Sequence, residues 1–174
     1  MDGCTWCLCN EKMKKYHDEE WGVPLHDDHR QFEFLMMEVM QCGLNWNMMI
    51  QKREIFRQCF DGFDYDRIAV YTEADIERIL SCEGMIKSRR KVEAVIHNAR
   101  CFQKVREEYG SFSSYIWSFS RGKRAINGRI SRGWIKNAFV KASPAKLSPA
   151  SSAFRNSISA GWSDSTISGA SRVM

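Results

Sequence analysis

The sequence predicts an all-α protein, a helical bundle with short connections between its helices. Three observations support this fold class. Apolar residues recur at helical spacing over residues 1–120, and cap and stop signals separate the successive runs. Few alternating runs of β-branched residues compete with the helical pattern. With 174 residues, 44% of them hydrophobic, the chain is long enough for one compact domain with a hydrophobic core.

The first two predicted helices have clear boundaries. The aspartates at 27–28 form the expected N-cap of the first helix, and its apolar residues keep helical spacing until Gly43 ends it. The second helix fits the apolar residues within 46–60, and Gly62 follows as its stop.

Three further helices are expected downstream. Residues 72–75 have the spacing of a capping box, and Gly84 is the C-terminal signal of the helix that they open. Ser88 opens the next helix, which stops at Gly110. The aromatic-rich segment 111–119 is expected to be a short buried helix.

Charge divides the chain into two parts. Residues 1–120 carry 16 Lys and Arg against 20 Asp and Glu, whereas residues 121–174 carry 10 against the single Asp164. The second part also contains 11 serines and shows neither helical nor strand periodicity. We therefore predict a helical domain at 1–120 and a poorly ordered, basic, Ser/Ala-rich tail at 121–174. Such a tail is either a nucleic-acid-binding arm or a loose end.

Composition also limits the location. No apolar run approaches the roughly 20 residues that span a bilayer, and the first residues lack the pattern of a signal peptide. Seven cysteines, an odd number at irregular spacing, favour reduced thiols over disulfides. We expect a cytoplasmic protein without membrane contact, and a monomer because nothing in the length indicates a partner subunit.

Glu38 interrupts the most apolar helix of the chain. A carboxylate there is costly unless it is paired or meets a ligand, although a position at the helix edge would let it reach water. Trp46 follows it closely in sequence, and Trp6, Tyr16 and Trp21 crowd the N-terminal segment. These rings are either core or the walls of a pocket for a flat, electron-poor heterocycle.

A second anomaly is the basic cluster at residues 87–91. Lys87, Arg89, Arg90 and Lys91 lie at or just before a predicted helix N-terminus, where the helix dipole disfavours cations. A bound phosphate would resolve this conflict. The arrangement of helix, glycine turn and helix is that of a helix-hairpin-helix DNA-binding element, although a basic cluster can also be a solvated face.

The N-terminal cysteines are candidate metal ligands. Cys4 and Cys7 have the spacing of half a zinc site, with Cys9 and His17 nearby. Free thiols are the alternative, because no second Cys/His pair follows downstream.

Two motifs in this part of the chain are specific: Tyr16-His17-x3-Trp21-Gly22-x-Pro24 and Gly43-Leu44-x-Trp46. They are accompanied by Cys4, Phe32-Glu33, Glu38, Gln41-Cys42, Lys52-Arg53-Glu54, Gly84-Met85-Ile86, Arg89, Lys91, Asn98-Ala99-Arg100 and Trp117-Ser118-Phe119. Together these residues resemble the DNA-3-methyladenine glycosylase I family over about residues 1–120, without gaps.

The resemblance implies an enzyme that flips 3-methyladenine out of alkylated double-stranded DNA and hydrolyses its N-glycosidic bond. Glu38 would be the catalytic residue and would accept hydrogen bonds from the extruded base. Trp46 would stack on this base, and Trp6, Tyr16 and Trp21 would line the pocket.

The resemblance also implies the DNA contacts and a metal. Gln41, Gly43 and Leu44 would fill the gap left in the duplex. The residues of the phosphate-gripping hairpin would be Gly84, Lys87, Ser88, Arg89 and Lys91. Cys4 and His17 would be two of the four ligands of a structural zinc ion.

The chain departs from the family pattern in places. Met13, Val39 and Asn45 replace an aromatic residue, a glycine and a serine, which concerns base selectivity rather than the reaction. Family members end with a His and a Cys that complete the zinc site, and neither type occurs after Cys101. We hypothesise that the tail is translated out of frame. Two alternative functions remain, a non-catalytic helix-hairpin-helix DNA-binding module and an inactive, truncated family relative.

Overall fold

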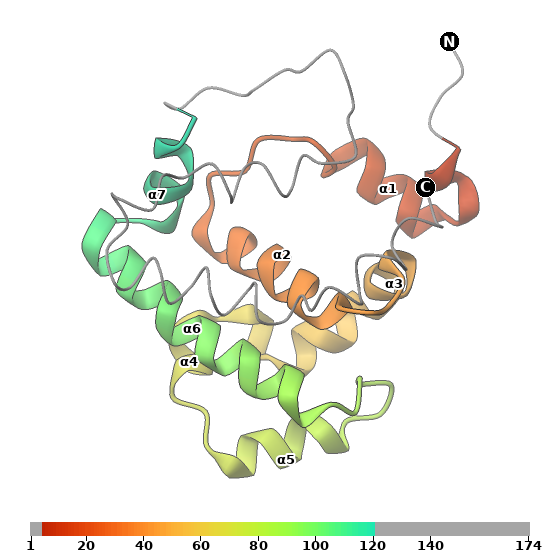
Figure 1. Cartoon of the computed structure of the whole chain (residues 1–174). Coiled ribbons are helices and arrows are strands. Elements are labelled where there is room, and N and C mark those ends of the chain that lie inside the picture. Colours follow the sequence, from red (N-terminus) through yellow and green to blue (C-terminus); the bar gives the residue numbers. More distant parts are fainter. Residues whose placement is uncertain (1–4, 121–174) are drawn as a thin grey trace.

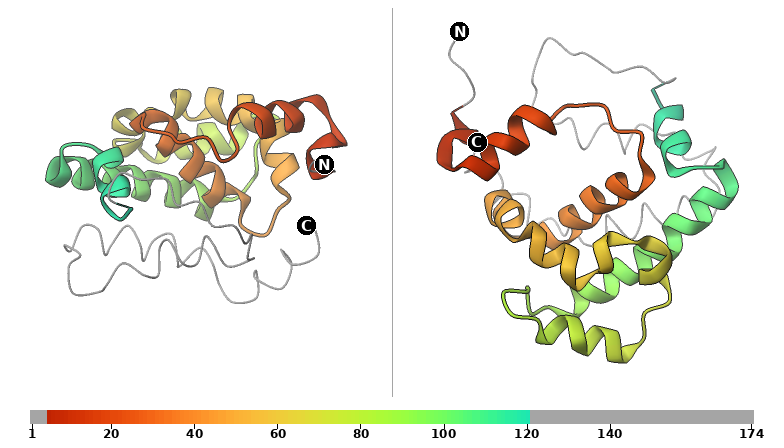
Figure 2. Two further views of the ribbon diagram at one scale, coloured as in Figure 1. Left: turned by 90° about the horizontal axis from the view of Figure 1, so that it is seen from above. Right: turned by 180° about the vertical axis from the view of Figure 1, so that it is seen from behind.

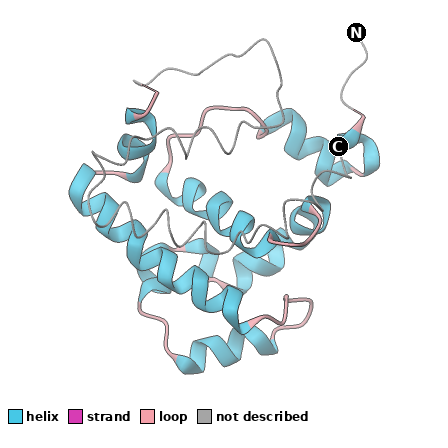
Figure 3. Cartoon of the chain, viewed as in Figure 1, coloured by secondary structure: helices cyan, strands magenta, loops and turns pink. Residues whose placement is uncertain are grey.

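Helices joined by short loops make up the part of the chain that the computed structural model describes, residues 5–120 (Figure 3). No strand occurs within these residues, which confirms the all-α class. The elements are η1 (Trp6–Cys9), α1 (Glu11–Glu19), α2 (Asp28–Gln41), α3 (Trp46–Cys59), η2 (Asp61–Phe63), α4 (Tyr65–Ala69), α5 (Glu73–Ser81), α6 (Arg89–Tyr109) and α7 (Phe112–Ser118). None of the described helices is long and apolar enough to cross a membrane.

Helix α2 lies in the middle of the molecule and packs against α3, α6 and α7 (Figure 1). Phe32, Met36 and Met40 of α2 are fully buried, as the helical spacing predicts. The ring of Phe32 meets that of Phe102 from α6 edge to face, with 5.1 Å between centroids. This packing fixes the helix that carries Glu38 against the long helix α6.

The N-terminal helix α1 and the helix α5 lie far apart in the fold. Helices α1 and α5 lie at opposite ends of the described part, with α2 between them (Figure 2). Helix α5 packs against α6, and α1 packs against α3. Helices α1 and α5 are therefore connected through α3, α2 and α6.

The predicted caps of α2 and α5 are confirmed, whereas Ser88 takes the N-cap position of α6 without a side-chain hydrogen bond. The Asp27 carboxylate accepts a hydrogen bond from the backbone in the first turn of α2 at 2.8 Å, and Ser111 caps α7 in the same way at 2.9 Å. Thr72 and Asp75 form the predicted capping box of α5. These caps explain why cap spacing predicts these starts to within a residue.

Asp28 joins the start of α2 to α6 and α7. Its carboxylate accepts hydrogen bonds from the backbone N–H groups of Phe112 and Ser113 at 3.0 and 2.9 Å. Arg106 of α6 adds an ion pair at 3.1 Å. A single half-buried carboxylate thus caps α7 and links three helices.

Helices α1 and α4 were not predicted from the sequence. In α1 only Met13 is buried, so its apolar residues give little helical periodicity, and the cap at Asn10 was the available signal. Helix α4 has five residues, too few for a period to appear. The short buried helix expected at 111–119 is α7, which buries Phe112 and Tyr115, whereas Phe119 lies just beyond its end and is 47% exposed. The predicted tail at 121–174 lies outside the described residues.

Candidate active site

Glu38 lies one turn before the end of α2, half-buried by its surroundings. Burial raises the pKa of its carboxyl group to about 7. Within residues 5–120, no hydrogen bond or ion pair engages this carboxylate. Near neutral pH the group is therefore held close to its titration midpoint, and its oxygens remain available to a ligand.

Glu33, on the same helix, shows the contrast. Burial alone would raise the pKa of Glu33, but hydrogen bonds from Arg53 and Arg57 outweigh it and hold the pKa below its ordinary value. The two glutamates of α2 therefore differ in function: Glu33 is a structural ion-pair partner, and Glu38 lacks such partners in the described part of the chain.

Tyr16 is the centre of an aromatic cluster beside Glu38. Its ring centroid lies 5.7 Å from that of Trp46, 6.3 Å from that of Phe34 and 6.5 Å from that of Trp6. Burial and the charge of Glu38 raise the pKa of Tyr16 to about 12, so its phenol stays protonated at physiological pH. The cluster gathers rings from η1, α1, α2 and α3 around Tyr16, the ring whose pKa the charge of Glu38 affects.

Trp21 extends this cluster toward solvent. Its indole meets that of Trp6 edge to face at 5.4 Å and is 48% exposed. Four of the five predicted site residues, all but Glu38, are thereby linked by ring contacts. Phe34 belongs to the same cluster and was missed as a site residue, although it lies one helical turn before Glu38.

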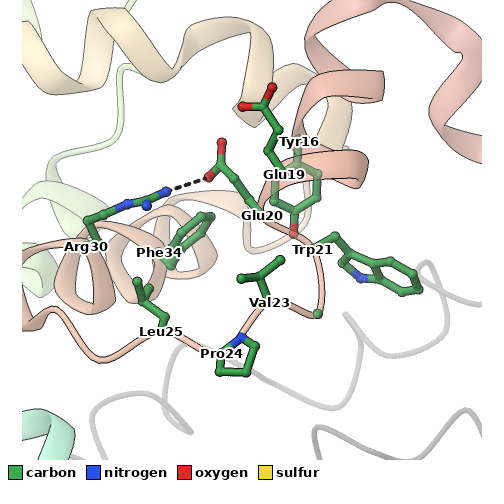
Figure 4. Close-up of a pocket in the computed structure, with 10 residues that line it drawn as sticks. Tyr16, Glu19, Glu20, Trp21, Val23, Pro24, Leu25, Arg30 and Phe34 are labelled. Carbon is green, nitrogen blue, oxygen red and sulfur yellow. Dashed lines mark hydrogen bonds and ion pairs between the residues drawn. The ribbon is translucent and has the colours of Figure 1, made fainter.

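An open hollow of about 240 Å³ adjoins the aromatic cluster (Figure 4). It shares Tyr16, Trp21 and Phe34 with the cluster, whereas Glu38 and Trp46 are not among its lining residues. Its walls are Tyr16, Glu19, Glu20, Trp21, Gly22, Val23, Pro24, Leu25, Arg30 and Phe34. Its size suits a small heterocycle, and the loop after α1 forms most of its wall.

Arg53 of α3 contacts two residues that line this hollow, Glu20 and Phe34. Its guanidinium donates to both carboxylate oxygens of Glu20, at 2.9 and 2.8 Å, and also pairs with Glu33. It also lies 4.9 Å from the centre of the Phe34 ring. Glu20 directly precedes Trp21, so Arg53 contacts one ring of the cluster, Phe34, and holds the residue next to another. Arg53 appears in the family motif, but its role was not predicted because its partners come from other elements.

The turn after α2 is closed by its own hydrogen bonds. The side-chain amide of Gln41 donates to the Leu44 carbonyl at 2.6 Å, and the Leu44 N–H donates back to the Gln41 carbonyl. Gly43 is exposed with a φ of 79°, a left-handed conformation that favours glycine. The three residues predicted to fill a gap in DNA thus form one compact, partly exposed turn.

The turn between α5 and α6 contains the predicted hairpin residues. Gly84 has a φ of 75°, and Ser88 is the N-cap residue of α6. Lys87 and Arg90 are exposed and have no hydrogen-bond or ion-pair partner within residues 5–120.

Arg89 and Lys91 have partners inside the molecule. Arg89 forms ion pairs with Glu73 and Glu77 of α5. Lys91 donates to the carbonyl oxygens of Met40 and Cys42. The unfavourable cations at this helix start are therefore partly offset without a phosphate, and DNA contact by either residue stays a prediction.

The zinc prediction finds no support in the described residues. The imidazole of His17 stacks on the Trp21 indole at 5.4 Å, and its Nδ1 lies 2.8 Å from an oxygen of Asp18. No group of three His, Cys, Asp or Glu side chains suited to a metal occurs among residues 5–120. Cys4 lies outside this range, and the sequence has no His or Cys beyond Cys101. The donors present here do not fit a zinc ion, so zinc remains an expectation from the resemblance.

Within residues 5–120, helices place the Glu38 carboxylate, which has no partner there, near the phenol of an aromatic cluster, an architecture that suits a protein that binds a flat heterocycle. The sequence matches the methyladenine glycosylase family over residues 6–148, and the chain belongs to this family. The match includes residues 121–148, which our sequence analysis assigned to the tail.

Two bacterial enzymes are among its relatives. The chain is 38% identical over 119 residues to DNA-3-methyladenine glycosylase 1 of Escherichia coli K12, covering 68% of this chain and 64% of that enzyme. It is 36% identical over 124 residues to DNA-3-methyladenine glycosylase of Haemophilus influenzae, covering 71% and 67%. The chain thus spans somewhat less than two-thirds of the length of the first of these relatives.

Solved structures of 3-methyladenine DNA glycosylase I have the same fold. One crystal structure has a TM-score of 0.71 at 34% identity and covers 90% of each chain. The Staphylococcus aureus enzyme, solved to explain 3-methyladenine recognition, has a TM-score of 0.64 at 33% identity, covering 66% of this chain and 61% of its own.

Proposed function

We propose that this chain is a DNA glycosylase that hydrolyses the N-glycosidic bond of 3-methyladenine in alkylated double-stranded DNA. The observation that carries the proposal is Glu38, a half-buried carboxylate without a partner in residues 5–120, near Tyr16, whose ring contacts that of Trp46. The names of its family relatives agree with this substrate. We further propose that it acts in the cytoplasm as a monomer.

The chemistry suits such a site. A 3-methylated adenine in DNA carries a positive charge, and its glycosidic bond is already weakened. Aromatic faces attract a cationic ring, and the Glu38 carboxylate opposes its charge. As the bond between the sugar carbon and the base nitrogen breaks, its electron pair goes to the base, which leaves neutral. A water molecule attacks the sugar carbon and loses a proton to solvent, so no covalent enzyme intermediate is required.

DNA binding would use the end of the molecule at which α2 and α6 meet. Extruding a nucleotide costs a few kcal/mol of stacking, which a residue inserted into the gap offsets. The compact turn of Gln41, Gly43 and Leu44 is the candidate for this insertion. The exposed cations Lys87 and Arg90 have no partners in the described residues and are the candidates for phosphate contact.

The test is release of free base from methylated duplex DNA by the purified full-length chain. We expect release of 3-methyladenine, and we expect Glu38→Gln to slow it by a factor of about 100 or more because an electrostatic contact to the reacting base is lost. DNA affinity should change much less.

Glu107→Gln is the matched control, since Glu107 is an exposed acid at the far end of α6. It should release base at the native rate. A native chain that is folded by circular dichroism and binds DNA without releasing base would overturn the proposal and favour the non-catalytic binding module. A folded chain that neither binds nor cleaves would favour the inactive relative.

A further inference from the structure

Lys91 reaches from the first turn of α6 to the end of α2. Its Nζ donates hydrogen bonds to the carbonyl oxygen of Met40 at 2.7 Å and to that of Cys42 at 2.9 Å. The side chain is half-buried, and this burial lowers the pKa of its amine. Two charge-assisted hydrogen bonds to backbone thus occupy an ammonium group that the family resemblance would assign to DNA phosphate.

The end of α2 creates the need for such a donor. The last carbonyl groups of a helix lack partners within the helix and carry partial negative charge. After Gln41 the chain leaves helical geometry at once, with Cys42 at φ −33° and ψ 110°, and turns through Gly43. A lysine ammonium is favourable at this position, because cations near a helix C-terminus complement its dipole.

The same contact explains the anomaly at the start of α6. Lys91 lies in the first turn of its own helix, where the dipole of α6 disfavours it. The side chain of Lys91 extends to the C-terminus of α2, so its charge lies at the negative end of the α2 dipole instead of at the positive end of the α6 dipole. Lys91 therefore needs no phosphate to account for its position.

Glu38 is close to this contact along the backbone. It lies on the last turn of α2, and its carbonyl oxygen accepts a hydrogen bond from the Cys42 thiol at 3.6 Å. The Lys91 acceptors, Met40 and Cys42, flank the first residue of the Gln41–Leu44 turn. Because Lys91 holds these two carbonyl groups, it also fixes the position of Glu38 and of the Gln41–Leu44 turn relative to α6.

A second lysine, Lys52, donates to a backbone carbonyl of the turn between α5 and α6. The Nζ of Lys52, from α3, donates to the carbonyl oxygen of Gly84 at 2.5 Å. Lys52 thus links α3 to the α5–α6 turn, and Lys91 links α6 to the α2 turn. Together they hold the two candidate DNA-contacting turns in one arrangement.

We propose that Lys91 is a positioning residue, which holds Glu38 and the Gln41–Leu44 turn in place by capping α2, and that it is not a phosphate contact. This proposal rests on the proposed glycosylase function for its effect on base release. Its structural part, the capping of α2 in the protein without DNA, stands independently of that function.

Lys91→Met tests both parts, because methionine keeps the length and flexibility of the side chain and removes the donor. We expect faster amide hydrogen exchange at residues 41–45 in the DNA-free protein and a roughly tenfold or greater drop in single-turnover base release, the effect of losing a charge-assisted hydrogen bond. The slope of log Kd against log salt concentration should stay unchanged. Lys91→Arg, which retains donors, should restore most of the rate.

Lys87→Met is the matched control. Lys87 is exposed and has no partner in the described residues, so its substitution should reduce the salt slope by about one and leave amide exchange at residues 41–45 unchanged. If Lys91→Met instead lowers the salt slope like Lys87→Met and leaves both exchange and rate intact, the proposal is wrong.

A measurement on the native chain covers the case in which Lys91→Met fails to fold. Lysine acetylation, read by mass spectrometry with and without duplex DNA, should find Lys91 poorly reactive in both states. Lys87 should be reactive alone and protected by DNA. High reactivity of Lys91 alone, with protection by DNA, would overturn the proposal. A chain that releases no base would refute the glycosylase function, while exchange and acetylation would still decide the role of Lys91.

Discussion

Glu33 and Glu38 lie on the same helix, yet their carboxyl groups have opposite electrostatic environments. Arg53 and Arg57 hold the pKa of Glu33 low, whereas burial raises that of Glu38 to about 7. The environment of Glu38 is unfavourable for stability, because ionisation of a buried carboxyl group without a partner opposes folding. The cost is explained if the carboxylate serves a ligand.

This cost gives a prediction on stability. The pKa of the Glu38 carboxyl group is near its ordinary value of 4.5 in the unfolded chain and about 7 in the folded chain. Between these values the folded state binds more protons, so the free energy of unfolding falls as pH rises and levels off above pH 7. Below about pH 4.5 the group is protonated in both states, and the penalty vanishes.

Glu38→Gln should therefore be more stable than the native chain above pH 7, by up to about 3 kcal/mol, and of similar stability below pH 4.5. Urea unfolding of both proteins at pH 4 and pH 8 measures the difference. Glu107→Gln, at an exposed acid, should show no such pH-dependent gain. A Glu38→Gln gain that is absent at pH 8, or equal at both pH values, would mean that Glu38 is solvated in the folded protein.

At the scale of elements, sequence patterns predicted the helices that bury a regular apolar face. Helices α2, α3, α5, α6 and α7 were found in this way, and α1 was missed because it buries only Met13. The acid and the rings of the site were predictable from residue types, since a carboxylate among apolar residues is itself a signal. The roles of Arg53 and Lys91 were not predictable, because their hydrogen-bond partners lie far away in the sequence. Lys91, for example, donates to carbonyl oxygens 51 and 49 positions away. Partners that distant leave no local pattern.

Arg53 joins the loop after α1 to α2 and α3, and this gives a prediction on the packing of these elements. Arg53→Met leaves the buried carboxylates of Glu20 and Glu33 without their main partner, so we expect a loss of about 3–5 kcal/mol in the free energy of unfolding. Chemical denaturation at pH 7 measures it. The pocket wall should loosen as well, seen as altered tryptophan fluorescence.

Arg57→Met is the control for this loss. Arg57 also pairs with Glu33 but is more exposed, so its substitution should cost only about 1 kcal/mol. Adding Glu33→Gln to Arg53→Met should recover part of the loss, since one unpaired buried charge is removed. Equal losses in the two arginine variants would contradict a bracing role for Arg53.

At the scale of the whole molecule, the residues that match the motifs carry more acid than base. Residues 1–120 have 20 acidic against 16 basic side chains, so attraction to DNA within this part must come from local clusters rather than from net charge. The exposed Lys87 and Arg90 at the start of α6 form such a cluster. The turn that carries Leu44 is joined to α6 by Lys91, so the proposed phosphate contacts and the proposed base recognition would lie on connected elements.

The central claim is that an ionised Glu38, with a raised pKa, opposes the charge of an extruded cationic base. The pH dependence of kcat/KM for base release, measured from pH 5 to 9 with methylated duplex DNA, tests it most directly because this quantity reports the titration of the free enzyme. The native chain should gain activity with an apparent pKa of about 7, the value that burial gives Glu38, and Glu38→Gln should be slow and without this rise. A native profile that is flat through pH 7, or a Glu38→Gln profile that keeps the same rise, would contradict it.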